Sequence, residues 1–185
     1  AVGGQAEDIS AILAVILAGG VAVPFNRKSH QHTRSDLASA TSARFVLSKP
    51  EYKRRCNPSP VKISEVLPPK RPLLDDAAVV TFTSGSTGKP KGVVLSRKKI
   101  SAKLEIICEA VKMFDSPVAL VPLQLQFSFG QWATFLPLMM GGTVHITARF
   151  SATWANQIMR NQPITHFAAV PTMLRLMLEG EHDTR

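Results

Sequence analysis

The chain has 185 residues, of which 45% are hydrophobic and 19% are charged. This length suits one domain of ordinary size or a large piece of a bigger one, and the composition excludes a wholly disordered chain. Lys and Arg number 22 against 13 Asp and Glu, which gives a net charge of +9. Such a charge favours an anionic partner, without choosing among nucleic acid, acidic lipid and a phosphorylated small molecule.

The cysteine content and the apolar runs indicate the expected compartment. The chain has 2 cysteines, Cys56 and Cys108, too few for a disulfide scaffold or a four-cysteine zinc site. The longest uncharged apolar run, residues 11–25, is shorter than the roughly 20 residues of a membrane-spanning helix. No segment resembles a signal peptide. We therefore expect reduced thiols, a cytoplasmic location and no transmembrane segment.

Hydrophobic spacing and turn residues predict the elements of the first half. The predicted helix at 7–18 is apolar nearly all round and so should be buried, and Gly19-Gly20 ends it. Residues 49–72 hold six prolines and should form a surface excursion with one short strand near 61–63. The other expected elements are a strand at 21–23 closed by Pro24, a helix capped by Ser35 that runs to about residue 42, and a strand at 44–47.

Helices and strands alternate in the second half. This rhythm predicts an α/β fold with largely parallel sheet layers flanked by helices. The expected strands are 77–83, 118–121, 143–147 and 165–170, and the apolar segment 92–95 lies between the first two. The expected helices are 100–114, 132–140 ended by Gly141-Gly142, a helix capped by Ser151 that ends near 161, and one opened by Pro171 with Leu174, Met177 and Leu178 on one face.

Residues 83–92, with the sequence TSGSTGKPKG, carry the most chemical information. Their three glycines allow positive φ and a close approach of ligand to backbone, and successive N–H groups in such a turn can bind an anion beside the hydroxyls and the two lysines. Pro90 after Gly88-Lys89 excludes a Walker A loop, and the glycine spacing excludes G-x-G-x-x-G. From composition alone, a polyphosphate-binding loop and a hydroxyl-rich hairpin without a ligand are equally supported.

The same ten residues closely resemble the signature loop of the adenylate-forming superfamily. That superfamily includes acyl- and aryl-CoA synthetases, luciferases and the adenylation domains of peptide synthetases. The resemblance covers nearly the whole chain and is weak only at 49–72. The other segments that carry it are the helix, Gly-Gly and strand of 11–26, the helix and strand of 35–47, and residues 127–130, 140–143 and 165–174.

The resemblance implies a two-step reaction. A carboxylate attacks the α-phosphate of ATP to give an acyl-adenylate and pyrophosphate, and the thiol of coenzyme A or of a carrier-protein pantetheine then takes the acyl group. It thus implies ATP, Mg²⁺ and one of these thiols, with a small carboxylic acid as substrate and fatty acid metabolism as the expected setting. The residues that it places against the β- and γ-phosphates are Thr83, Ser84, Gly85, Ser86, Thr87, Gly88 and Lys91, with less weight on Lys89.

Two departures from the family pattern leave the acid open. Arg97 follows Ser96 where the family commonly has His, and the family pattern P-L-x-H-x-F-G becomes PLQLQFSFG at 122–130, without His. The alternative for the aromatic candidates near this motif is a plain core position. The candidate acyl contacts are Phe127, Phe129, Gly130, Trp132 and Val170.

Several family parts have no counterpart in these residues. They are the aromatic-G-x-T-E motif, the ribose-binding aspartate motif, the hinge and the lysine-bearing C-terminal domain, so we name no catalytic residue. We expect residues 1–185 to be a fragment of the large N-terminal AMP-binding domain of an acid–thiol ligase resembling acyl-CoA synthetases, and to be inactive alone. A peptide-synthetase-type adenylation domain that loads a carrier protein and a non-catalytic homologue remain alternatives.

Other site types have little support in the sequence. His30 and His32 alternate in a polar loop, but no acidic or cysteine partner lies at ligand spacing, so we predict no metal site. The basic runs at 53–55 and 97–99 suggest a nucleic-acid-binding module. Because the chain lacks interleaved aromatic residues and a recognition motif, we expect no nucleic-acid partner.

Overall fold

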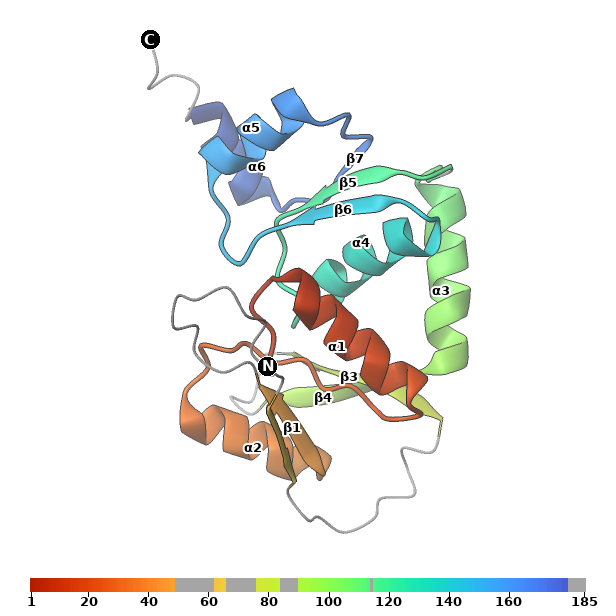
Figure 1. Cartoon of the computed structure of the whole chain (residues 1–185), viewed down its shortest axis with the longest axis vertical. Coiled ribbons are helices and arrows are strands. Elements are labelled where there is room, and N and C mark those ends of the chain that lie inside the picture. The colour runs from red at the N-terminus through yellow and green to blue at the C-terminus, as the bar shows by residue number, and fades with distance from the viewer. Residues whose placement is uncertain (49–61, 66–75, 84–89, 114, 180–185) are drawn as a thin grey trace. The chain divides into compact units, whose positions relative to one another are not determined.

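The computed structural model describes residues 1–48, 62–65, 76–83, 90–113 and 115–179 (Figure 1). They fall into two compact units: an N-terminal unit of residues 1–3 and 7–96, and a C-terminal unit of residues 4–6 and 97–185. Both units combine helices with strands, which confirms the α/β class. In the described part of the chain, no helix has the length and apolar character needed to cross a membrane.

The two helices that open the chain form where the sequence predicts them, but with different surroundings. Helix α1 (Ala6–Leu17) buries Asp8, Ile9 and Ile12, whereas Leu17 is 85% exposed, so the expected burial all round is wrong. A surface helix buries only the stripe that faces its neighbours. Helix α2 (Gln31–Thr41) has His30 at its N-cap, without a side-chain cap. Ser35 therefore lies inside the helix and is not its cap.

Strand β3 (Ala77–Thr83) is the centre of the N-terminal unit. Its first five residues are buried, and β4 (Lys91–Ser96) pairs with it antiparallel. On the other side, Ala22 donates to the carbonyl of Ala78 and accepts from the N–H of Val80, both at 2.8 Å. The predicted strand at 21–23 is thus reduced to one parallel bridge.

Strands β1 (Phe45–Ser48) and β2 (Lys62–Glu65) confirm the two strands predicted around the proline-rich segment. They pair antiparallel, with Phe45 opposite Glu65, so parallel pairing at this position is wrong. Consecutive strands that fold back on each other pair antiparallel, whereas parallel pairing needs a crossover connection. The rest of the proline-rich segment lies outside the described residues.

The C-terminal unit holds a three-stranded parallel sheet, as predicted. Strand β5 lies between β6 and β7 and pairs parallel with both. The Ser151 cap is confirmed, because its hydroxyl accepts from the N–H of Trp154, and Pro171 begins the last helix. The elements are α3 (Arg97–Ala110), β5 (Val118–Val121), α4 (Ser128–Met139), β6 (Thr143–Ile146), α5 (Ala152–Asn161), β7 (His166–Phe167) and α6 (Pro171–Glu179).

Helices cover both faces of this sheet. Ala119 and Val121 of β5 pack with Ala133 of α4 on one face. Leu120, whose side chain points the other way, packs with Ala155 of α5 and Met177 of α6. Only Met177 of the predicted apolar face of α6 is buried, because Leu174 and Leu178 are exposed.

A buried carboxylate ties the first turn of α1 to the strand-like segment after it. Asp8 is 5% exposed, and its two oxygens accept from the guanidinium of Arg27 at 2.9 Å and from the N–H of Gly3 at 2.8 Å. Arg27 is 33% exposed, so water screens part of this ion pair. The two hydrogen bonds hold three separate points of the N-terminal unit together.

We predict that Asp8→Ala lowers the free energy of unfolding by about 1–3 kcal/mol, because it leaves the donors of Gly3 and Arg27 without this acceptor. Chemical denaturation followed by circular dichroism measures the change. Glu7→Ala is the matched control, since Glu7 lies in the same first turn but is exposed. An equal loss in both variants would assign the effect to the helix dipole instead.

Candidate functional site

The two ends of the predicted phosphate loop lie opposite each other. Thr83 ends β3, Lys91 begins β4, and the two are paired in register. The Thr83 hydroxyl donates to the carbonyl of Lys91 at 3.4 Å, and both residues are exposed. A threonine and a lysine are therefore cross-strand neighbours at the end of a hairpin. The predicted residues Ser84, Gly85, Ser86, Thr87 and Gly88, and Lys89 with them, lie outside the described residues.

The base of this loop is fixed by its strands. Strand β3 pairs with β4 up to Thr83, and Ala22 bonds its other side at residues 78–80. Gly92 does not take the positive φ expected of it. A Cβ at Gly92 would lie 3.2 Å from a methyl carbon of Val80 and 3.3 Å from the Phe82 ring, so the missing side chain leaves room for these two residues. Glycine at position 92 is thus explained by side-chain packing on the hairpin, and not by a turn.

The candidate acyl contacts follow two neighbouring parallel strands of the C-terminal unit. The chain leaves β5 toward α4 on one face of the sheet, and it leaves β7 toward α6, whose Met177 packs on the other face. Ligands of open α/β sheets bind at such a point, beyond the carboxyl ends of adjacent strands whose connections diverge. The structure brings to this end Phe127, Phe129, Gly130 and Trp132, which follow β5, and Val170, which follows β7.

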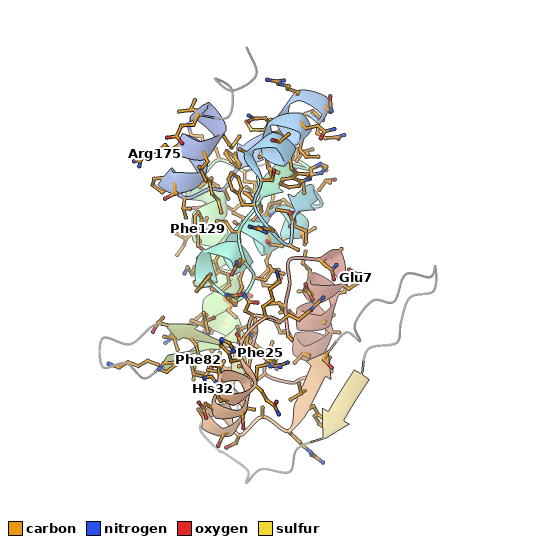
Figure 2. The ribbon with its side chains drawn as sticks, turned by 90° about the vertical axis from the view of Figure 1, so that its left-hand side faces the viewer. Glu7, Phe25, His32, Phe82, Phe129 and Arg175 are labelled. Atoms are coloured by element: carbon orange, nitrogen blue, oxygen red, sulfur yellow. The ribbon has the colours of Figure 1, made fainter. Side chains whose placement is uncertain are left out.

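These candidates differ in how much of each is exposed. Phe127 and Phe129 are 54% and 51% exposed, and Val170 is 38% exposed, so none of the three is a core residue. Figure 2 labels Phe129 in the first turn of α4. Trp132 is buried, which favours the core alternative for it, and the ammonium of Lys103 lies 4.7 Å from the centre of its ring. Its contact with an acid stays a prediction.

Sequence reasoning missed a buried amide that holds the segment between β5 and α4. Gln131 is fully buried, and its side-chain N–H donates to the carbonyl of Leu125 at 2.9 Å. Beside it, a Cβ at Gly130 would lie 2.2 Å from the carbonyl oxygen of Gln124. The segment 124–127 is therefore pressed against the start of α4 and tied to it. A single buried amide within an otherwise apolar helix is the sequence signal that could have revealed it.

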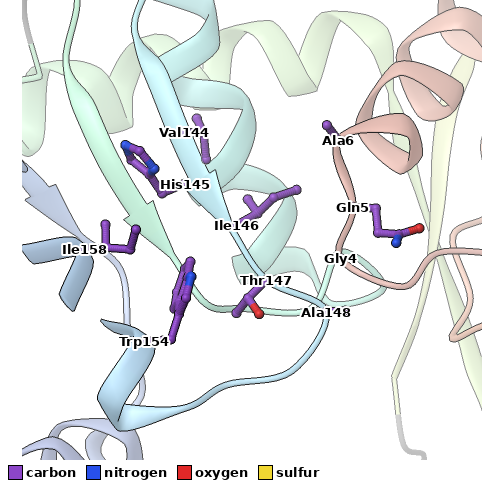
Figure 3. Close-up of a pocket in the computed structure, with 10 residues that line it drawn as sticks. All are labelled: Gly4, Gln5, Ala6, Val144, His145, Ile146, Thr147, Ala148, Trp154 and Ile158. Atoms are coloured by element: carbon purple, nitrogen blue, oxygen red, sulfur yellow. The ribbon is translucent and has the colours of Figure 1, made fainter. Parts of the chain in front are cut away.

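A separate pocket of about 530 Å³ lies in the C-terminal unit (Figure 3). It is bordered by β6, the residues after that strand, α5 and residues 4–6 of the same unit. His145 is the titratable side chain in its described lining. None of the residues predicted from the sequence to contact phosphate or the acyl group is part of that lining. The residues are Gly4, Gln5, Ala6, Val144, His145, Ile146, Thr147, Ala148, Trp154 and Ile158.

The described residues contain no group of three or more His, Cys, Asp or Glu side chains that could hold a metal ion by themselves. His30 and His32 stack, with ring centres 5.6 Å apart. The two imidazoles form a ring contact at the start of α2, without a third ligand among the residues described there.

Comparisons with known proteins agree with these features. A family model described as AMP-binding enzyme matches residues 5–185. A malonate–CoA ligase of Arabidopsis thaliana is 28% identical, over 95% of this chain and 35% of that protein. Chondramide synthase cmdD of Chondromyces crocatus is 25% identical, over 94% of this chain and 5% of that protein.

A solved structure gives the same answer for the fold. A malonyl-CoA ligase, in a ternary product complex with methylmalonyl-CoA and AMP bound, matches with a TM-score of 0.79 and 27% identity. The match covers 97% of this chain and 40% of that one. The chain thus spans well under half the length of the two ligases it matches.

We predict that Gly130→Ala lowers the melting temperature, because the added methyl group and the carbonyl of Gln124 cannot occupy the same space. A loss of stability of about 1–3 kcal/mol is expected for such overpacking. Ser128→Ala, two residues earlier on α4 and half-buried, is the matched control. Equal melting temperatures for Gly130→Ala and the wild type would contradict the close contact between residues 124 and 130.

Proposed function

Because the chain belongs to the family of AMP-binding enzymes, we propose that it is part of an ATP-dependent acid–thiol ligase of the acyl-CoA synthetase kind. The observation that carries the proposal is the β3–β4 hairpin, which sets Thr83 opposite Lys91 at the ends of a loop rich in glycine and hydroxyl groups. The Arabidopsis relative, whose name is that of a CoA ligase, supports the same reaction. Residues 1–185 are then part of the large N-terminal domain.

In the first step, the loop holds ATP in place while the bond to the leaving pyrophosphate breaks. A carboxylate oxygen of the acid attacks the α-phosphorus, and the bond between this phosphorus and the bridging oxygen to the β-phosphate breaks. The Lys91 ammonium offsets negative charge on the β- and γ-phosphates, and the Thr83 hydroxyl turns from the carbonyl of Lys91 to donate to phosphate beside it. Residues 84–88 add backbone and hydroxyl donors in this proposal.

The exposed cation of Lys91 at the hairpin end fits a polyphosphate, and in the part of the chain that the structure describes no ion pair joins Lys91 to a carboxylate. When bound with ATP, Mg²⁺ would supply further charge neutralisation at the phosphates. Metal ions of this kind bind mainly through substrate phosphates and water, so the absence of a three-ligand protein cluster among the described residues does not conflict with it.

In the second step, a thiol attacks the carbonyl carbon of the acyl-adenylate, and AMP leaves. We assign coenzyme A as the acceptor because the solved ligase and the Arabidopsis relative are both named for it. A carrier-protein pantetheine is the second candidate, and the likeness to chondramide synthase favours it. A cytoplasmic location belongs to the same proposal, supported by the low cysteine content.

We predict that Lys91→Ala slows ATP-dependent adenylation by about 10²–10³-fold, as removal of one preorganised donor does in other enzymes. The measurement is single-turnover pyrophosphate release, with saturating acid, by the protein that carries this chain. Lys98→Ala removes the same charge from an exposed position on α3 and should leave the rate unchanged. Because Lys91 is exposed, thermal melts of the variants should match the wild type.

Thr83→Val tests the hydroxyl separately, since it keeps the size of the side chain and removes the donor. A rate equal to that of the wild type in both Lys91→Ala and Thr83→Val would mean that the loop is only a connector. A collapse of the melt in either variant would instead assign the loop a structural role.

We also predict that residues 1–185 alone do not exchange pyrophosphate into ATP with any acid of a mixed panel. The proposal places the ribose-binding motif and the catalytic lysine outside these residues, and adenylation depends on charges supplied from both parts. Robust exchange by the isolated piece would contradict the assignment of the lysine to a separate domain.

A further inference from the structure

Residues 124–127, which connect β5 to α4, form a turn that depends on donors from elsewhere. The N–H of Phe127 donates to the carbonyl of Gln124 at 3.2 Å and closes the turn. Leu125, inside the turn, is 1% exposed. A buried carbonyl that finds no donor costs free energy, so the conformation of this turn depends on what pairs with its carbonyls.

Gln131 supplies two of these donors. Its side-chain N–H donates to the carbonyl of Leu125 at 2.9 Å, and its backbone N–H donates to the carbonyl of Phe127 at 3.1 Å. The residue is fully buried in the first turn of α4. One residue of the helix thus holds the middle and the end of the turn.

Phe127 stands at the end of this turn with a fixed backbone and an exposed ring. It is the extended N-cap residue of α4, and its side chain makes no cap hydrogen bond. The ring is 54% exposed, so little packing holds it. Its position therefore depends mainly on the backbone bonds of residues 124–127. An exposed side chain on a backbone that is already ordered is preorganised for a ligand.

The amide of Gln131 stands out among the buried residues of an apolar helix. Its buried neighbours on α4 include Trp132, Phe135 and Leu136. A buried amide is unfavourable unless it is hydrogen-bonded, and an apolar side chain would fill the same space at no such cost. It would leave the carbonyl of Leu125 without this donor. What the amide adds is therefore the hold on the turn.

From these contacts we infer that Gln131 is a positioning residue for acid binding, which acts by holding the turn that carries Phe127. The inference rests on the proposed function, with Phe127 as a contact of the acid. Gln131 is fully buried and acts only through the turn. A turn without this hold would have to be ordered when the acid binds, and affinity for the acid would fall. Affinity for ATP should not change, because Thr83 and Lys91 belong to the other unit.

Gln131→Met tests the inference, because it keeps the length of the side chain and removes the donor. Pyrophosphate release is measured with the protein that carries this chain, using whichever of hexanoate, benzoate and malonate gives the highest wild-type kcat/KM. We expect KM for the acid to rise at least about 10-fold, more than kcat falls, and KM for ATP to stay within about twofold. An unchanged KM for the acid, with a lower melting temperature, would make Gln131 merely structural and overturn the inference.

Thr134→Val is the matched control. Thr134 lies one turn later on α4 and is also fully buried, and the substitution removes a buried hydroxyl at the same size. Both variants are assayed below their melting transitions, which thermal melts determine. Thr134→Val should leave KM for the acid at the wild-type value. An equal rise of this KM in both variants would assign the effect to any polar loss inside α4 and overturn the inference.

A double-mutant cycle with Phe127→Ala tests whether Gln131 acts through the ring. In the Phe127→Ala background, Gln131→Met should raise KM for the acid by less than about twofold, because the group that it positions is already gone. Effects that multiply independently would overturn the inference. If Gln131→Met does not fold, Gln131→Asn carries the same comparisons, since its shorter amide cannot reach the carbonyl of Leu125 without a shift of the turn.

These failures are distinct from a failure of the proposed function. A wild-type protein that releases no pyrophosphate with any acid of a broad panel would reject the ligase reaction, and the inference with it. A working ligase whose KM for the acid does not respond to Gln131→Met would overturn the inference alone.

Discussion

A parallel strand buried on both faces requires a helix on each side of its sheet, and β5 is such a strand. Its residues 119–121 are at most 2% exposed. Helix α4 covers one face, and α5 with Met177 of α6 covers the other, whereas Ala168 and Met173, which follow β7, pack with the cluster on the α4 side. The candidate acyl contacts come from the connecting segments, as Phe127 and Val170 do, and from the first turn of α4, as Phe129 does. Burial of one apolar strand thus determines where a ligand can approach this unit.

In the N-terminal unit, a buried strand supports the end of a loop. Strand β3 is buried along most of its length and is held by β4 on one side and by Ala22 on the other. The loop that follows has no apolar residue of its own to anchor it, so its position depends on this strand. Rigid support beneath a loop rich in glycine lowers the cost of ordering that loop around a ligand.

Local signals in the sequence were sufficient for most elements. The β-branched run of β3, the cap at Ser151 and the proline at position 171 each act within a few residues, so pattern and structure agree there. Predictions of features that depend on distant contacts were wrong or were not made. The burial of α1 depends on which neighbours it has, and the partner of β1 depends on how the chain returns after the prolines. Ser35 resembles a cap, but the helix had already begun at Gln31.

The residues of the candidate site likewise fall into those that short motifs could predict and those that depend on distant contacts. The family resemblance singled out the phosphate loop and the aromatic residues from short motifs, and parallel pairing then placed the aromatic ones at one end of the sheet. Motif and composition could not reveal Gln131, because its importance comes from a hydrogen bond to a carbonyl six residues earlier in the chain. They counted Gly92 among the glycines that allow positive φ, whereas contacts with Val80 and Phe82 explain it.

The pairing of Thr83 with Lys91 closes residues 84–90 into a ring with a defined circumference. Side chains on a strand alternate between faces, so the loss or gain of one residue in this ring would either strain the closure or turn Lys91 to the other side of the hairpin. Replacement of a residue within the ring changes only the group that it presents. The register of the hairpin thus favours substitutions over insertions and deletions between Thr83 and Lys91.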